Sequence, residues 1–298
     1  MHETLAQVAP IPHAAPWGGL LAAYFTLIGI PSGLTLATWW HRSRFPNAPL
    51  ALDWRATWLC LGLLGGAGLL LTVDLGRPER FFLMLTRFGN WDSPISLGAK
   101  IIAIKTFLLG VALYLLWRRR TASKDAATPL PARGAAKYLD STVVWLLGVS
   151  SVALAVYPVA VLARTWVSPL AATSGSALIY LVTSLLMGLA VVEIMQPGSQ
   201  EVRHVAAHRQ VTLALLMTYA AALAFTAVSV PNGPAKQSLK AVVSGEWAPL
   251  FYGGAVGIGL VIPAVLLLLG HSTRWARLAA ACSVLAGTGI ARYLIFTA

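Results

Sequence analysis

Long runs of uncharged, apolar residues constrain this chain more than any other feature. One of them, TWLCLGLLGGAGLLLTV, covers residues 57–73, and several others have a similar length. A helix needs about 20 predominantly apolar residues to cross the hydrocarbon core of a bilayer. Only 11% of the residues are charged, whereas about 25% is usual in soluble domains. We therefore predict an all-α, polytopic integral membrane protein.

The apolar runs predict eight transmembrane helices. We place them at residues 17–40, 56–74, 97–117, 141–163, 176–196, 211–230, 250–270 and 278–297. We expect two four-helix bundles. The first would be formed by residues 1–120 and 137–165, the second by residues 166–298, with residues 118–140 as a basic linker.

The basic residues are distributed unevenly between the two sides of these spans. The side that carries the linker has 13 Lys and Arg residues and the opposite side has 6. Because basic loops stay in the cytoplasm, we expect a cytoplasmic linker and both termini outside. Loop charge of this kind explains the net charge of +12 better than nucleic-acid binding does. Residues 1–16 contain no Lys or Arg, so we expect no cleavable signal peptide.

Five ionisable side chains fall within or at the ends of the predicted spans. They are Asp74, Lys100, Lys105, Glu193 and Arg292. A charge in lipid costs a few kcal/mol or more, so each should face protein or water. The predicted orientation puts Asp74 and Lys100 at the outer edge and Glu193 near the cytoplasmic end. Lys100 and Glu193 could instead extend along the helix ends to reach water.

Two tyrosines, Tyr24 and Tyr157, are predicted about 10 Å below the outer surface, from the helical rise. This outer layer suits a quinone, whose two carbonyl groups require hydrogen-bond donors such as tyrosine hydroxyls. Asp74 could exchange protons between that site and outside water. Tyrosines near a membrane surface can also be simple interfacial anchors.

The sequence predicts no redox centre in the chain itself. All six histidines are expected in terminal or loop segments, and His204 and His208 on a solvated cytoplasmic helix, so neither haem nor another metal is expected. The two cysteines, Cys60 and Cys282, are too few for an iron–sulfur cluster. If the protein handles electrons, a partner must supply or remove them.

The segment DLGRPERFFLMLTRFGNWDSPISLGAK, at residues 74–100, resembles the NrfD/polysulfide-reductase membrane-subunit family, which has a similar LGRPERF signature. Three further segments are similar to helices of that family. They are AAYFTLIGIPSG (22–33), AVYPVAVLARTWVSP (155–169) and LAGTGIARYLIF (285–296). The chain departs from the family at Val159, where glycine is usual, and at Lys100, where an aromatic residue is common.

The resemblance implies a haem-free quinone-binding subunit with eight helices, in the cytoplasmic membrane of a bacterium. The ligand would be menaquinone or ubiquinone, bound by the first four helices. Carried over to this sequence, the first-helix position falls on Tyr24 and the fourth-helix tyrosine on Tyr157. We also expect Trp17, Asp74 and Lys100 in the pocket, with Asp74 and Lys100 as the proton-exchanging pair.

The resemblance also implies two partner proteins. One is an iron–sulfur subunit with four clusters, and the other is a molybdopterin catalytic subunit. The charged outer loop would dock the iron–sulfur subunit through Arg77, Glu79, Arg80 and Arg87.

Two other functions remain open from the sequence. The chain could translocate protons or act as a transporter, using Lys105, Glu193 and Arg292 as a path. It could also be a purely structural anchor.

Overall fold

The computed structural model describes residues 19–46, 48, 50–74, 94–122, 135–165, 168–196, 202–270 and 273–297. All regular secondary structure in this part of the chain is helical. The helices are α1 (Gly19–Arg44), α2 (Ala51–Asp74), α4 (Pro94–Ala122), α5 (Ala135–Thr165), α6 (Ser174–Met195), α7 (Val202–Ser229), α8 (Pro234–Ser244), the π-helix η2 (Leu250–Val261), α9 (Ile262–Leu269) and α10 (Arg274–Thr297).

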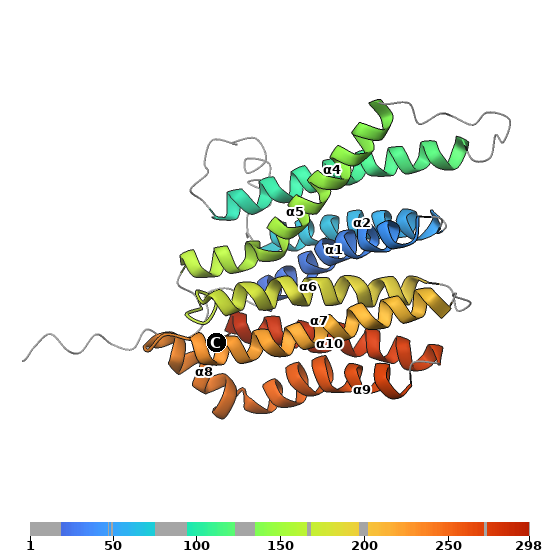
Figure 1. The fold of residues 1–298 in the computed structure, drawn as a ribbon. Coiled ribbons are helices and arrows are strands. Elements are labelled where there is room, and N and C mark those ends of the chain that lie inside the picture. Colours follow the sequence, from blue (N-terminus) through green and yellow to red (C-terminus); the bar gives the residue numbers. More distant parts are fainter. Residues whose placement is uncertain are drawn as a thin grey trace, which may run out of the picture.

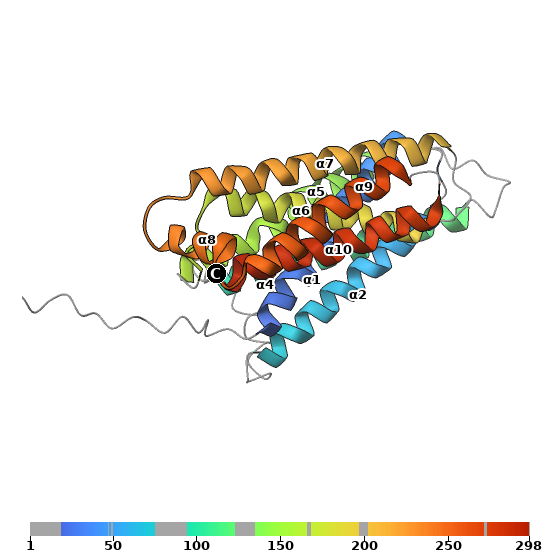
Figure 2. The same cartoon turned by 90° about the horizontal axis from the view of Figure 1, so that it is seen from below.

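Eight helical spans in the described residues are long and apolar enough to cross a membrane, with η2 and α9 together forming one of them. The long helices lie side by side (Figure 1), and the C-terminal end lies beside α8 in both views (Figure 2). The spans in α1, α5 and α6 are the most buried. The predicted all-α, polytopic fold is therefore confirmed, while the division into two bundles stays a prediction.

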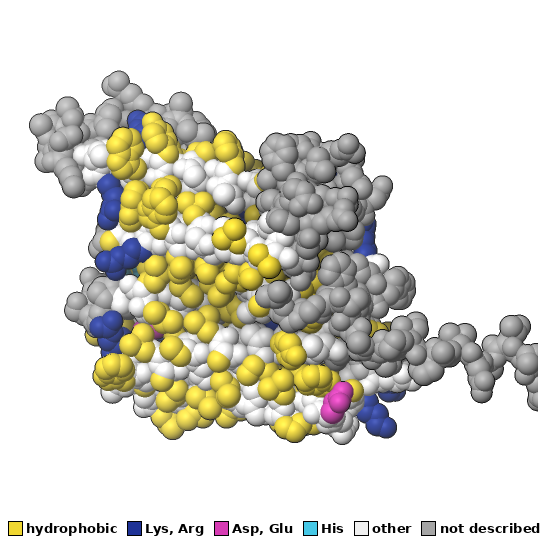
Figure 3. Space-filling model, turned by 180° about the vertical axis from the view of Figure 1, so that it is seen from behind, with side chains coloured by type: hydrophobic (Ala, Val, Ile, Leu, Met, Phe, Trp, Pro, Cys, Tyr) yellow, Lys and Arg dark blue, Asp and Glu magenta, His cyan; other side chains and the backbone are white. Residues whose placement is uncertain are grey.

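The outer surface of the helix bundle is apolar between its two ends. Figure 3 shows hydrophobic side chains over the middle of one face, with Lys and Arg side chains at its edges. Large apolar side chains that are mostly exposed include Leu69, Phe107, Met217, Val228 and Leu269. Exposed apolar surface of this extent suits contact with lipid tails, where such side chains lose nothing by facing outward.

Glycines allow the central helices to approach closely. A Cβ on Gly33 of α1 would lie 1.6 Å from the carbonyl oxygen of Ser184 in α6, and a Cβ on Gly188 would meet the backbone of Gly33. The same relationship joins Gly259 of η2 to Gly287 of α10. Small residues at helix contacts are a common way to pack membrane helices, because the backbones themselves come together.

Several helices extend beyond the predicted spans, mainly at their basic ends. Helix α7 begins at Val202, nine residues before the predicted start of its span, because a helix continues through charged residues once it leaves the hydrocarbon core. A short helix, α8, lies within a segment predicted as a loop. It starts with Pro234 and ends before Gly245, in agreement with the usual preferences for these residues at helix ends.

Candidate functional site

Tyr24 of α1 and Tyr157 of α5, the two predicted quinone-binding tyrosines, come together in the structure. Both side chains are buried, with exposed fractions of 2% and 5%. Their phenol groups lie close enough to interact electrostatically. Phe25 packs between the helices, with ring centroids 5.4 Å from Tyr24 and 6.5 Å from Tyr157. The two hydroxyl groups therefore share one aromatic, water-poor environment.

The hydroxyl group of Tyr24 is buried, and no donor or acceptor within the described residues makes a hydrogen bond of normal geometry with it. A buried hydroxyl without a partner costs about 1–3 kcal/mol. Such a group fits a ligand that supplies the missing acceptor, and a quinone carbonyl oxygen is an acceptor of this kind. The residues present therefore fit the head group that the sequence suggested.

The N-terminal part of α4 completes one wall of this site. Gly98 lies against Tyr157, and a Cβ at this position would be 2.0 Å from the ring carbon that bears the hydroxyl. Lys100, two residues further along α4, is only 2% exposed. Its side chain therefore does not reach water, and the alternative in which Lys100 extends along the helix end to water does not apply. Glycine at position 98 is thus what allows α4 to approach the tyrosine pair.

The other predicted residues of the pocket and docking loop are described less fully. Asp74 is the last residue of α2, and its side chain lies outside the described part of the structure. Trp17, in the predicted pocket, and the predicted docking residues also lie outside it. The docking residues are Arg77, Glu79, Arg80 and Arg87.

Arg292 of α10 is buried beside this site and makes four hydrogen bonds. Its guanidinium donates to the carbonyl oxygen of Phe25 at 3.0 Å, to the carbonyl oxygen of Tyr180 at 2.7 Å, to the hydroxyl of Thr183 at 3.0 Å and to the hydroxyl of Ser184. These contacts connect α10 with α1 and α6. Because Phe25 follows Tyr24 in the chain, Arg292 fixes the backbone that carries the first tyrosine.

Glu193 lies in a separate polar cluster at the basic end of the bundle. One carboxylate oxygen accepts a hydrogen bond from Nε of Arg277 at 2.8 Å, and the other lies 3.2 Å from Nδ1 of His208. All three side chains are buried. Glu193 is therefore held between α6, α7 and α10, instead of extending to water.

The expectation that the histidines lie in terminal or loop segments was wrong for His41, whereas a helix was expected at His204 and His208. His41 is in α1, and His204 and His208 are in α7. His208 is buried, so α7 is not simply a solvated cytoplasmic helix at this point. Within the described residues, no group of three or more His, Cys, Asp and Glu side chains is arranged to hold a metal ion.

Lys105 of α4 forms a third cluster, separate from the other two. It is fully buried, and its Nζ donates hydrogen bonds to the hydroxyl groups of Thr35, at 3.2 Å, and of Ser151. Among the described residues, no hydrogen bond or ion pair joins Lys105 to Glu193 or Arg292. The three residues of the alternative proton path thus occupy three different polar clusters.

A comparison with protein families identifies the family of this chain. The profile of the family described as "Polysulphide reductase, NrfD" matches residues 8–298. No curated protein is significantly similar to the chain. Since the family match covers almost every residue, this chain belongs to the NrfD polysulphide reductase family, whose members are membrane subunits of molybdoenzyme-type reductases.

Proposed function

We propose that the protein is the quinone- or quinol-binding membrane anchor of a multi-subunit oxidoreductase. Family membership supports the role of membrane subunit. The observation that supports quinone binding is the buried Tyr24 hydroxyl, which makes no hydrogen bond of normal geometry with a described residue and lies beside Tyr157.

Each residue of the site would have a physical role toward the head group. A bound quinone would supply the redox chemistry, because it takes up two electrons and two protons to become a quinol. Tyr24 and Tyr157 would donate hydrogen bonds to its carbonyl oxygens, which strengthen as negative charge develops there. The aromatic rings of Phe25 and Phe296 pack together, with centroids 6.1 Å apart, and would exclude water.

Two charged residues at the same end of the bundle would serve proton exchange. Lys100 is buried on α4, where a positive charge would stabilise a reduced, anionic head group. Asp74 ends α2 and would exchange protons with water outside the membrane.

The electrons would pass to or from a partner on the outer face. We propose an iron–sulfur subunit with four clusters, docked through Arg77, Glu79, Arg80 and Arg87, and a molybdopterin catalytic subunit beyond it. The anchor would lie in a bacterial cytoplasmic membrane with both termini outside. The ligand would be menaquinone or ubiquinone.

The test is quinol-dependent electron transfer in the intact complex, measured for Tyr24→Phe and Tyr157→Phe. Each variant removes one hydroxyl and keeps the ring. Loss of a hydrogen bond worth about 1.5 kcal/mol should lower kcat/KM about tenfold. Tyr114→Phe is the matched control, because Tyr114 is on α4 and 55% exposed. Unchanged kcat/KM in both site variants would show that the tyrosine pair does not bind the substrate, and would favour a structural anchor.

A further inference from the structure

A cavity of about 160 Å³ lies between α1, α2, α4 and α5, on the side of the bundle where the basic linker attaches. Two ion pairs border its mouth on the linker side, Arg42 with Asp53 and Arg119 with Asp140. At its inner end it reaches Thr35. This cavity is distinct from the tyrosine site, because neither Tyr24 nor Tyr157 is among the residues that line it.

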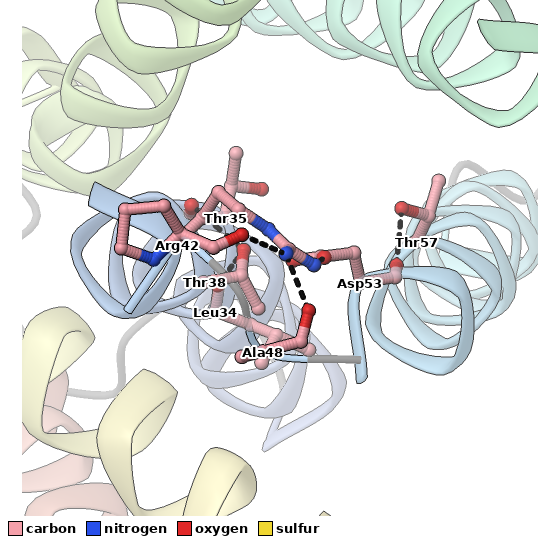
Figure 4. A network of polar contacts seen from close by, with 8 residues as sticks. Leu34, Thr35, Thr38, Arg42, Ala48, Asp53 and Thr57 are labelled. Carbon is pink, nitrogen blue, oxygen red and sulfur yellow. Dashed lines mark hydrogen bonds and ion pairs between the residues drawn. The ribbon is translucent and has the colours of Figure 1, made fainter. Parts of the chain in front are cut away.

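A polar track runs along the α1 and α2 walls of the cavity. Figure 4 shows Thr35, Thr38 and Arg42 on α1 and Asp53 and Thr57 on α2. The threonine hydroxyls donate to backbone carbonyls of their own helices, and this leaves their oxygen lone pairs as acceptors. The volume is sufficient for several water molecules, and water occupies such a space when polar partners are present.

Lys105 lies immediately beyond the inner end of this track. Its amine donates to Thr35 and Ser151, and these hydroxyls in turn donate to the carbonyl oxygens of Pro31 and Leu147. Two acceptors match a neutral amine, which has two N–H donors and one lone pair, whereas an ammonium has three donors. The arrangement therefore leaves a lone pair that can accept a proton.

The charged groups near Lys105 do not provide a permanent counter-ion. Among the described residues, no carboxylate lies within ion-pair distance of its amine. The thiol of Cys60, on α2, is 3.8 Å from the Thr35 hydroxyl. Asp53 and Asp140, at the mouth of the cavity, are each paired with an arginine. A buried lysine without a counter-ion is well suited to gain and lose a proton, because no salt bridge holds it in the charged form.

We propose that Lys105 and this cavity form a proton route from the cytoplasmic face toward the tyrosine site, a proposal that rests on the quinone-binding function above. The Lys105 amine accepts one proton from cavity water and becomes an ammonium. It then gives one proton toward the site and returns to the amine. Two such cycles, with two electrons from the iron–sulfur partner, convert one quinone to one quinol. In this route Lys105 supplies the protons in place of the exchange through Asp74, and quinol oxidation reverses every step.

The distances along the helices are compatible with this route. Ser151, which holds Lys105, precedes Tyr157 by six residues on α5, or about 9 Å of helical rise. Lys105 thus lies within two helical turns of the tyrosine pair. Protons from the cytoplasm and electrons from the outer face would then meet at one site, so turnover would separate charge across the membrane.

The first test measures whether the cavity is open to water, independently of any turnover. A single cysteine at Thr38, in a full-length chain with Cys60→Ala and Cys282→Ala, is exposed to a membrane-impermeant cationic thiol reagent. The matched control is Leu146→Cys, because Leu146 is on α5 at a similar depth but faces outward, 48% exposed. We expect labelling of Thr38→Cys at least tenfold faster than the control, and only from the linker side. Equal rates, or labelling from the opposite side, would overturn the water-filled cavity.

The second test measures proton exchange in sealed vesicles that contain the intact complex. Lys105→Met removes the ionisable amine, and Ile104→Met is the control on the adjacent lipid-exposed residue. We expect the pH change on the linker side, per electron transferred, to fall at least tenfold in Lys105→Met only. Normal turnover with unchanged proton exchange would overturn the role of Lys105. Absence of quinone-dependent turnover in the wild-type complex would overturn the proposed function, while the labelling result would still decide the cavity.

Discussion

The guanidinium of Arg292 donates a hydrogen bond to the carbonyl oxygen of Phe25, across 267 positions of sequence. This contact connects the last helix with the first, next to Tyr24. Arg292 also stacks on Tyr180, with the guanidinium carbon 4.9 Å from the ring centroid. A buried arginine is tolerated here because every part of its charge has a hydrogen-bond acceptor or an aromatic face. We infer that it is mainly a structural connection between α1, α6 and α10.

Replacing Arg292 should therefore destabilise the fold. Arg292→Met leaves the Thr183 hydroxyl and two backbone carbonyls with fewer partners, and we expect a loss of about 3 kcal/mol. The measurement is the thermal unfolding midpoint in detergent. Arg274→Met is the control on the same helix, since Arg274 is exposed. Equal midpoints for both variants would contradict the structural role.

Glycine at the contact between α1 and α6 should be required for their packing. A Cβ at Gly33 would lie 1.6 Å from a backbone oxygen of α6, so Gly33→Ala must push the helices apart. We expect a destabilisation of about 1–3 kcal/mol, measured by unfolding in detergent. The matched variant is Gly62→Ala on α2, where no atom lies within 4 Å of the added carbon. It should be neutral or slightly stabilising, and a similar loss in both would argue against a close contact.

Gly98→Ala tests whether the position of Tyr157 matters for the substrate. The added methyl group would overlap the Tyr157 phenol, so the ring has to move. If the proposed function is correct, the KM for quinol should rise several-fold in the assembled complex. Gly110→Ala on the same helix has open space around its added carbon and should leave KM unchanged. An unchanged KM in Gly98→Ala, with the complex intact, would place the substrate elsewhere.

The ion pair of Glu193 should contribute more to stability than the ion pairs at the cavity mouth. Removing Glu193 leaves the buried guanidinium of Arg277 without its carboxylate, which typically costs about 3–5 kcal/mol. Asp140→Asn breaks a pair whose arginine side chain is 51% exposed, where about 1 kcal/mol or less is usual. Unfolding of Glu193→Gln and Asp140→Asn in detergent compares the two. Similar losses would indicate that water reaches the Glu193 cluster.

The spans could be predicted from the sequence because the bilayer imposes a length and a composition on them. The predicted 176–196 agrees closely with the observed α6, Ser174–Met195. Positions of helix ends in water were less predictable, as α7 shows, since hydropathy detects only the part of a helix that lies in hydrocarbon. Helix α8 was missed because it is amphipathic and too short to cross the membrane, although the spacing of its apolar residues carried a signal.

The site was predictable in part. Tyr24 and Tyr157 were identified from their depth and from the family resemblance, and the structure brings them together. The buried cluster of Glu193, Arg277 and His208 was not identified. Its members lie on three helices, and hydropathy says nothing about which faces of those helices meet.

By itself, the sequence determined that this chain is an all-helical membrane protein with five costly charges in or near the bilayer. That follows from composition, because each backbone polar group and each charge must be satisfied where water is absent. Only the tertiary structure decided how three of these charges are satisfied. Arg292 bonds to backbone and hydroxyl oxygens, Glu193 pairs with Arg277, and Lys105 has only hydroxyl partners. Those partners depend on the rotation and close approach of neighbouring helices, which glycines such as Gly33 permit and which no single span encodes.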